Sequence, residues 1–295
     1  MAYNELSCST SAGNTGKQNC VENFGQDELI ILVPDTFEIA TKVLAETEAT
    51  WITAINAAVA TRGYPLFGHF NAEFEQEGRV PEEGWAGKSE TVRGGKHKAT
   101  YIMENVSFYN HKEIRKHNSR TKLAYYKVSA RGYIKGWSED DVKFLPFPLS
   151  DLYVNDRNDS DGATIDRTSI YCEEKDGTKW NDKGVWVKPT AFDPLLLEGI
   201  KDCTITGTLL GGGETVTVRG ASDLVGVIGL VAANFSLVAD LAPTVLIPVV
   251  VAADNLDGTY DLTHAAITGA HTMTLVNQPI GTNGYEAIDE INTTV

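Results

Sequence analysis

The sequence has few cysteines and no long apolar run. Only 4 of its 295 residues are cysteine, and no two stand in a Cys-x-x-Cys pair or beside a histidine at zinc-finger spacing. No uninterrupted apolar stretch approaches the roughly 18 residues that a membrane-spanning helix needs. No secretory signal pattern opens the chain, so we expect reduced thiols, although a disulfide between Cys8 and Cys20 would close a Gly/Ser/Asn-rich loop. These features exclude a zinc finger and a disulfide-rich scaffold.

Basic residues are scarce and unevenly placed. The chain carries 25 Lys and Arg against 40 Asp and Glu, a net charge of −15. Residues 88–135 nevertheless hold 12 basic and 3 acidic side chains, whereas residues 202–295 hold 1 basic and 10 acidic side chains. The overall acidity argues against general nucleic-acid binding, because phosphate would repel the protein. A basic block in an acidic chain favours oriented association with a second copy.

Catalytic and ligand-binding motifs are also missing. The chain has no Gly-x-Ser-x-Gly nucleophile motif. Gly87-Lys88-Ser89 lacks the upstream glycine and the strand-to-helix context of a phosphate loop. The oxygen-rich segment Asn155–Gly162 could hold Ca²⁺, but an EF-hand reading places Arg157 at its first position, so a solvated turn is favoured. We predict no enzymatic activity, no metal and no cofactor.

One amphipathic helix is expected near the start of the chain. Alanine-rich Thr41–Gly63 ends with Gly63 and is followed by Pro65, as helix termini often are. The apolar residues near helical spacing are Val43, Leu44, Trp51, Ile52, Ile55 and Val59. Short strands follow, so the pattern predicts an antiparallel sandwich or barrel with one packed helix.

Within that strand-rich part, Ala99–Tyr109 and Thr121–Gly136 are predicted to form a hairpin. Their connection, Asn110–Arg120, is too long for a tight turn and is expected to be a projecting arm or a short helical turn. Further strands are expected at Glu28–Pro34, Leu66–Gly78, Thr168–Glu174, Gly184–Pro189 and Lys201–Leu210.

The triglycine Gly211–Gly213 predicts a hinge at residues 209–213, between a domain at residues 1–208 and a domain at residues 214–295. The second domain is predicted to be a small Ig-like β-sandwich. Asp257 and Gly258 can supply the positive φ of its tight hairpin turn. Its strands are expected at Thr215–Gly220, Gly226–Val231, Phe235–Asp240, Thr244–Ala253, Thr259–Thr263 and Thr272–Val276.

Two parts of the chain resemble known families. Asp254–Thr263 (DNLDGTYDLT) and Ile267–Val276 (ITGAHTMTLV) resemble the Ig-like add-on domains of bacterial surface proteins and phage virion proteins. The N-terminal segments CSTSAGNTGKQNC, YPLFGHF, FYNHKEIRKHN and GYIKGWSEDDVKFLPFPLSDLYV resemble structural proteins of phages that infect Bacteroidetes-type hosts. The layout is similar to tail-tube proteins, which form stacked rings by joining the sheets of neighbouring copies. The early position of the helix departs from the usual tail-tube order.

The resemblance implies a non-enzymatic virion protein, made in the host cytoplasm, that assembles into a homo-oligomeric ring or tail tube with outward Ig-like domains. Expected partners are further copies, other virion proteins and DNA passing through the lumen, with no membrane. The alternatives are a capsid or head decoration protein, a neck protein, and a surface adhesin or carbohydrate-binding module. The predicted subunit interface joins basic Lys112, Arg115, Lys116 and Arg120 to acidic Glu73, Glu75 and Glu77.

Overall fold

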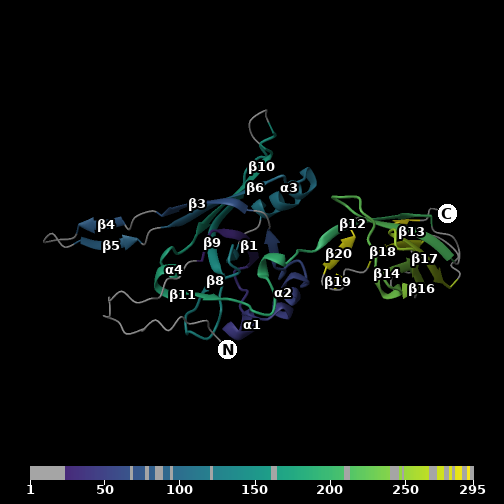
Figure 1. Ribbon diagram of the computed structural model, residues 1–295, viewed down its shortest axis with the longest axis horizontal. Coiled ribbons are helices and arrows are strands. Elements are labelled where there is room, and N and C mark those ends of the chain that lie inside the picture. Colours follow the sequence, from purple (N-terminus) through teal and green to yellow (C-terminus); the bar gives the residue numbers. More distant parts are fainter. Residues whose placement is uncertain are drawn as a thin grey trace. The chain divides into compact units, whose positions relative to one another are not determined.

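The computed structural model describes residues 24–66, 69–76, 80–83, 89–93, 96–119, 122–160, 165–208, 213–239, 246–247, 249–265, 271–275, 279–280, 283–287 and 291–292. The chain divides into two compact units, Met1–Leu197 (unit 1) and Glu198–Val295 (unit 2). Both consist mainly of antiparallel strands, with a few short helices in unit 1 (Figure 1). The predicted fold class is therefore confirmed.

Unit 1 is built on a nine-stranded sheet that curls into a half-barrel. The strands follow one another in the order β11-β8-β7-β9-β10-β6-β3, and β1 pairs with both β7 and β2. Their bounds are β1 Asp27–Pro34, β2 Tyr64–Leu66, β3 His69–Gln76, β6 His97–Glu104, β7 Leu123–Ser129, β8 Ile134–Trp137, β9 Phe147–Val154, β10 Arg167–Glu174 and β11 Gly184–Val187. Strands predicted at the positions of β1, β3, β10 and β11 are confirmed.

Strands β4 (Val80–Glu83) and β5 (Ser89–Arg93) pair with each other as a separate ribbon. The last pair of β3 and β6 is Gln76 with His97, and the first pair of the ribbon, Val80 with Arg93, lies four residues further along both strands. The ribbon therefore continues the register of the β3–β6 ladder.

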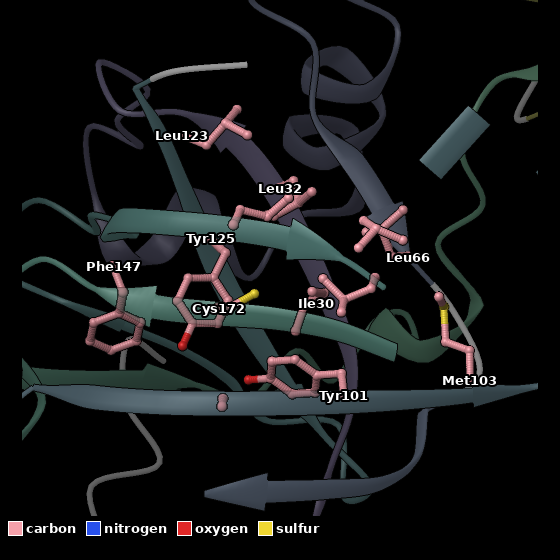
Figure 2. Packing of buried hydrophobic residues seen from close by; sticks show 13 residues of the cluster. Ile30, Leu32, Leu66, Tyr101, Met103, Leu123, Tyr125, Phe147 and Cys172 are labelled. Carbon is pink, nitrogen blue, oxygen red and sulfur yellow. The ribbon is translucent and has the colours of Figure 1, made fainter. Parts of the chain in front are cut away.

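The concave face of the half-barrel holds the core of unit 1. Alternate residues of a strand point to the same face, so β1, β6, β7, β9 and β10 each contribute side chains to it (Figure 2). The members labelled there are Ile30, Leu32, Leu66, Tyr101, Met103, Leu123, Tyr125, Phe147 and Cys172. Burial raises the pKa of the Cys172 thiol to about 12, so this cysteine packs as an apolar residue.

The single helix predicted at Thr41–Gly63 is wrong, because two short helices occupy its first part. Helix α1 spans Lys42–Ala45 and helix α2 spans Glu48–Ile55. The indole N–H of Trp51 donates a hydrogen bond of 2.9 Å to the Ala45 carbonyl oxygen. This bond satisfies a carbonyl at the end of α1, which would otherwise lack a partner, and thereby stabilises the break.

The helices cover the face of β1 and β7 that is opposite the half-barrel core. Trp51 meets Tyr126 edge to face at 5.1 Å, and Tyr126 stacks on Phe144 at the same centroid distance. The strands β1 and β7 are consequently buried on both faces, which explains the unbroken apolar run in β1. Three residues predicted for the helix core, Val43, Leu44 and Val59, are exposed instead.

The predicted hairpin between Ala99–Tyr109 and Thr121–Gly136 is also wrong. Strand β6 pairs with β3 and β10, whereas β7 pairs with β1, β8 and β9. Helix α3 (Phe108–Arg115) and the 3₁₀-helix η2 (Lys116–Ser119) fill the connection, which confirms the helical alternative for this segment. Because this connection is long, β6 and β7 need not pair with each other. Each pairs instead with the strands that bury its apolar face.

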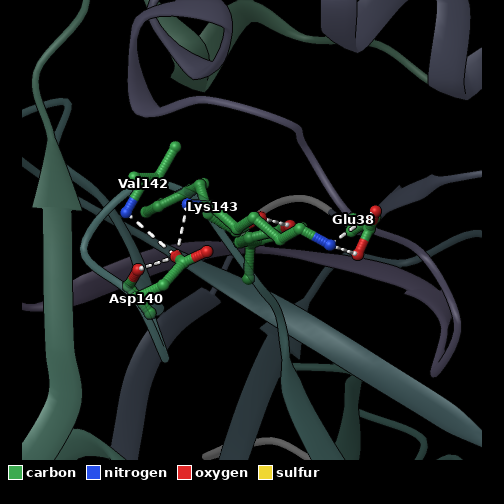
Figure 3. A network of polar contacts seen from close by, with 7 residues as sticks. Glu38, Asp140, Val142 and Lys143 are labelled. Carbon is green, nitrogen blue, oxygen red and sulfur yellow. Dashed lines mark hydrogen bonds and ion pairs between the residues drawn. The ribbon is translucent and has the colours of Figure 1, made fainter.

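A polar network fixes the loop between β8 and β9 (Figure 3). One carboxylate oxygen of Asp140 accepts hydrogen bonds from the backbone N–H groups of Lys143 (2.9 Å) and Val142 (3.0 Å), and these bonds lower the pKa of Asp140. The Lys143 ammonium donates to Glu38 at 2.8 Å, and this hydrogen bond raises the pKa of Lys143. The loop is thereby tied to the segment that follows β1. Two further short elements, α4 (Thr178–Lys183) and η3 (Pro194–Leu196), complete unit 1.

Unit 2 consists of two sheets that pack around an aliphatic core. One sheet has the order β16-β17-β13-β12-β20-β19 and the other the order β15-β14-β18-β21. The bounds are β12 Lys201–Gly207, β13 Gly213–Gly220, η4 Ala232–Asn234, β14 Phe235–Ala239, β15 Leu246–Ile247, β16 Val249–Asp254, β17 Thr259–His264, β18 His271–Leu275, β19 Pro279–Ile280, β20 Asn283–Ala287 and β21 Ile291–Asn292. Val218, Leu262, Leu237 and Met273 come from both sheets and share one core cluster.

The boundary between the units differs from the predicted one. Strand β12 pairs with β13 and, in parallel, with β20, so it belongs to unit 2 rather than to the end of unit 1. The chain therefore divides at Leu197, and the predicted hinge follows β12 within unit 2. Gly213 begins β13 and pairs with Thr263, while Gly211 and Gly212 lie outside the described residues.

Candidate assembly surfaces

Strand β3 forms one end of the sheet of unit 1. Among the described strands, β3 pairs with β6 alone, although it is eight residues long. Phe74 points to the concave face, since its ring lies 6.3 Å from that of Tyr101, yet its side chain is 57% exposed. Glu73 and Glu75 are exposed and point to the opposite face by strand alternation. The β3 edge therefore presents the Phe74 ring on the concave face, next to the core, and the Glu73 and Glu75 carboxylates on the opposite face.

A buried ion pair lies directly inside this edge. Lys127 of β7 donates to Glu174 of β10 at 2.6 Å, and Tyr125 donates to the same carboxylate oxygen at 2.8 Å. The Lys127 ammonium also lies 5.0 to 5.9 Å from the ring centroids of Phe147, Tyr125 and Phe74. The carboxylate and the rings around it compensate the buried cation.

The basic segment predicted as an interface is carried by α3 and η2. Ser107 caps α3 by accepting the N–H of Asn110 at 3.1 Å. The buried His111 contacts the Thr168 hydroxyl at 3.0 Å, and burial together with nearby Arg115 lowers the pKa of His111. His117 is buried against the ring of Tyr64 at 4.7 Å. The two histidines therefore anchor the segment to β10 and β2.

The cations of this segment point outward. Phe108, the first residue of α3, is 59% exposed, with the Lys112 ammonium 5.0 Å from its ring centroid. The Arg157 guanidinium, 5.9 Å from the same centroid, is mostly buried and forms an ion pair with Asp166. Arg115 forms an ion pair of 2.8 Å with Asp156, and both side chains are largely exposed. Exposed pairs of this kind contribute only about 0–1 kcal/mol, so they can exchange for a partner's carboxylate. We call Phe108, Lys112 and Arg115 the α3 surface.

The predicted interface residues divide into three groups. Lys112, Arg115 and Lys116 are exposed on α3 and η2, and Lys116 contacts Glu113 of the same helix. Glu73 and Glu75 are exposed on β3, and Arg120 and Glu77 lie outside the described residues. The structure therefore places the basic and acidic groups on different elements of unit 1. Their docking between copies stays a prediction.

Other candidate sites from the sequence have structural roles. In the oxygen-rich segment, Asp156 faces Arg115 and Asn158 bridges to Arg167, while Asp161 and Gly162 lie outside the described residues. Within the described ranges, no group of three or more His, Cys, Asp or Glu side chains has the arrangement of a metal site. Ser89 begins strand β5 rather than a helix, which agrees with the rejection of a phosphate loop. Cys8 and Cys20 lie outside the described residues.

A hollow of about 660 Å³ lies on unit 1 beside Asp35, Glu38 and Trp137. The face of the Trp137 ring is covered by the Lys179 ammonium, 3.3 Å from its centroid. A sugar would have to displace this cation before it could stack on the ring. No helix among the described residues is both long and apolar enough to cross a membrane.

Unit 2 exposes a cluster of large aliphatic side chains, which we call the apolar end. Its members are Leu224, Val225 and Ile228 of the loop after β13, and Leu256 of the β16–β17 turn, each more than half exposed. The predicted strand at Gly226–Val231 is wrong. This segment forms an irregular loop because Val227 and Leu230 point into the core, three residues apart, which strand alternation does not allow.

Hydrogen bonds hold the loop of the apolar end in place. The buried Tyr260 hydroxyl donates to the Val227 carbonyl at 2.6 Å and accepts the Leu230 N–H at 3.2 Å. The Gly229 N–H donates to Asp254 at 2.6 Å. Gly226 and Gly258 lie against each other, since a Cβ on Gly258 would come within 2.5 Å of the Gly226 Cα. The loop and the turn therefore form one continuous surface.

Sequence reasoning missed Phe74, Phe108 and the apolar end as surface features. An amphipathic pattern does not tell which apolar residues remain uncovered. One local signal was present, because Leu256 interrupts an otherwise polar turn of Asn, Asp and Gly. No known protein family matches the chain, and no curated protein is significantly similar to it.

Proposed function

We propose that this protein is a non-enzymatic structural component of a phage particle that assembles into a homo-oligomeric ring or tube, in the manner of a major tail protein. The resemblance of its two parts to virion proteins supports this function. The net charge of −15 suits a lumen through which DNA passes, because repulsion keeps phosphate from adhering to the wall.

The observation that carries the proposal is the β3 edge. An eight-residue strand with one described neighbour presents backbone N–H and C=O groups to a further strand. A strand from a neighbouring copy would extend the half-barrel and cover Phe74, whose ring already contacts the core. Burying such a ring contributes about 2–3 kcal/mol at each subunit contact, and the contact recurs around a closed ring.

The test is the assembly of the full chain carrying Phe74→Asp. We expect the unchanged protein to form rings or tubes in negative-stain images and to sediment as a large oligomer, whereas Phe74→Asp stays monomeric. Tyr153→Asp is the matched control, because Tyr153 is a similarly exposed aromatic residue on β9, which has β7 and β10 as neighbours. That variant is expected to assemble normally.

Tryptophan fluorescence during thermal unfolding verifies that both variants fold, since all five tryptophans belong to unit 1. A protein that stays monomeric under all solution conditions contradicts the proposed function. Saturable glycan binding by such a monomer would indicate the adhesin alternative. Normal assembly of Phe74→Asp would show that the β3 edge does not form the subunit contact.

A further inference from the structure

We propose that the apolar end of unit 2 binds the α3 surface of a second copy of this chain. This inference rests on the proposed function and names one contact within the assembly. It would link the two kinds of unit head to tail, so that each copy uses its unit 2 to hold the unit 1 of a neighbour.

The apolar end has the features of a preformed binding surface. Leu224 and Leu256 both have a positive φ, of 59° and 63°, although leucine rarely adopts this conformation. This backbone conformation is strained for leucine, yet the two residues remain 66% and 76% exposed. Among the described residues of unit 2, nothing buries these two side chains enough to offset that strain. A partner that covers both leucines would supply the missing apolar burial.

The hydrogen bonds to Tyr260 and Asp254 hold this surface in one conformation before binding. A preformed loop loses little conformational entropy on association, so more of the apolar burial contributes to affinity. Clustered exposed aliphatic side chains of this kind mark interaction sites more often than isolated exposed leucines do.

The charge around the apolar end selects the partner. Residues 198–295 contain 11 acidic and 2 basic side chains, and Asp223 and Asp257 lie exposed beside the leucines. The partner surface should therefore be apolar at its centre and basic at its rim. The α3 surface fits, because exposed Phe108 has the exposed Lys112 ammonium 5.0 Å from its ring centroid. Arg115 on the same helix is held by an exposed ion pair with Asp156, which a carboxylate of the partner can replace.

Other surfaces of a second copy fit less well. Two apolar ends facing each other would bring two acidic units together, and like charges oppose that contact. The β3 edge also carries an exposed ring, Phe74, but Glu73 and Glu75 flank it. The cation near Phe74, Lys127, is buried and paired with Glu174, whereas Lys112 beside Phe108 is exposed.

Disulfide trapping between two differently tagged copies tests the contact directly. One full-length copy carries Phe108→Cys and the other carries Leu256→Cys. Cys8 and Cys20 are replaced by serine in both copies, while Cys172 and Cys203 are already buried. After mild oxidation of the mixture, we expect a mixed disulfide dimer. Val250→Cys replaces Leu256→Cys in the control, since Val250 is 68% exposed on β16 of the same unit. We expect at least about tenfold less mixed dimer from that control.

A charge exchange provides an independent measurement in the unchanged cysteine background. Asp223→Arg and Arg115→Glu should each weaken assembly about tenfold in sedimentation, which corresponds to about 1.4 kcal/mol. A chain that carries both substitutions should recover much of the assembly, because opposite charges again meet between copies. High salt should weaken the assembly of the unchanged protein by screening this attraction.

The outcomes separate this contact from the proposed function. Rings that form without a preference for the Phe108–Leu256 disulfide overturn this contact and leave the assembly standing. Disulfides between two Leu256→Cys copies in place of the mixed dimer overturn it in favour of two apolar ends in contact. A specific mixed dimer from a chain that never forms rings supports the contact and contradicts the ring.

Discussion

Among the described residues, each unit buries one glutamate, and the two units compensate its charge in different ways. In unit 1, Glu174 accepts hydrogen bonds from Lys127 and Tyr125, with aromatic rings around the cation. In unit 2, Glu214 of β13 is fully buried and contacts the His264 Nε2 at 2.8 Å. The first arrangement uses a permanent cation in an aromatic core, and the second uses a histidine at the end of an aliphatic core.

The unit 2 arrangement constrains the position of protons. The His264 Nδ1 lies 2.7 Å from the Ala265 carbonyl oxygen, which can only accept, so Nδ1 carries a hydrogen. The Nε2 atom on the other side of the ring contacts the buried carboxylate of Glu214. His271, from the other sheet, lies 3.8 Å from the same carboxylate oxygen. A buried carboxylate is thus tolerated wherever its neighbours supply protons or charge.

The two units can be followed separately in one sample, because all five tryptophans precede residue 187 and none belongs to unit 2. Tryptophan fluorescence therefore reports the unfolding of unit 1. Far-ultraviolet circular dichroism reports both units. Substitutions in each core can then show whether the two units unfold independently.

The largest effect is expected from Glu174→Ala. It leaves the Lys127 cation buried without its carboxylate, which should destabilise unit 1 by about 3–5 kcal/mol. The fluorescence transition should move to lower denaturant concentration while unit 2 keeps its own transition. The double variant Lys127→Met/Glu174→Leu removes both charges and should recover most of the stability. An unchanged fluorescence transition in Glu174→Ala would show that the pair contributes nothing to unit 1.

A smaller effect is expected in unit 2 from Tyr260→Phe. Loss of the hydroxyl leaves the Val227 carbonyl and the Leu230 N–H without this partner, at a cost of about 1–3 kcal/mol. Circular dichroism should show earlier unfolding of unit 2, with tryptophan fluorescence unchanged. Thr263→Val, at an exposed site on the same strand, is the control with little expected change. A shift of the fluorescence transition as well would mean that the units do not unfold independently.

The smallest expected effect is the pH dependence that His111 gives to the stability of unit 1. Its pKa is lowered in the folded state by burial and by Arg115, so the unfolded chain binds this proton more readily. The contribution of His111 to stability should be constant above about pH 7 and should fall as the pH drops below about 6.5, the ordinary pKa of histidine. His111→Asn should lose this dependence while retaining a polar contact with Thr168. A His111 contribution that grows on acidification would contradict the assignment.

Several elements could be predicted from the sequence because they depend on local patterns. The apolar run of β1 and the alternation in β10 and β17 mark strands wherever their partners lie. Tyr260 and Leu262 share a buried face, as strand alternation predicts, but the positive φ of that turn falls on Leu256 and Gly258 rather than on Asp257. Local sequence indicated the turn, whereas packing against the loop selected its backbone conformation.

The predictions that failed concern which segments contact one another, rather than where most of the strands lie. Strand β12 was expected as a strand, but the sequence did not indicate that it pairs with β13 across the triglycine. The long helix was predicted because Ala-rich sequence has helical propensity, and the Trp51 indole contact with Ala45 interrupts it. For the candidate surfaces, charge segregation pointed to the α3 segment, but nothing local showed that Phe74 or Leu256 would stay uncovered.

The sequence by itself determined that this protein is rich in strands, poor in thiol chemistry and divided into a basic segment and an acidic C-terminal part. Composition and alternation set these properties, and both can be read one residue at a time. Only the tertiary structure decided which strands pair, where the units divide and which apolar side chains remain exposed. Those outcomes depend on contacts between residues far apart in the chain, where the burial of whole faces outweighs local preference.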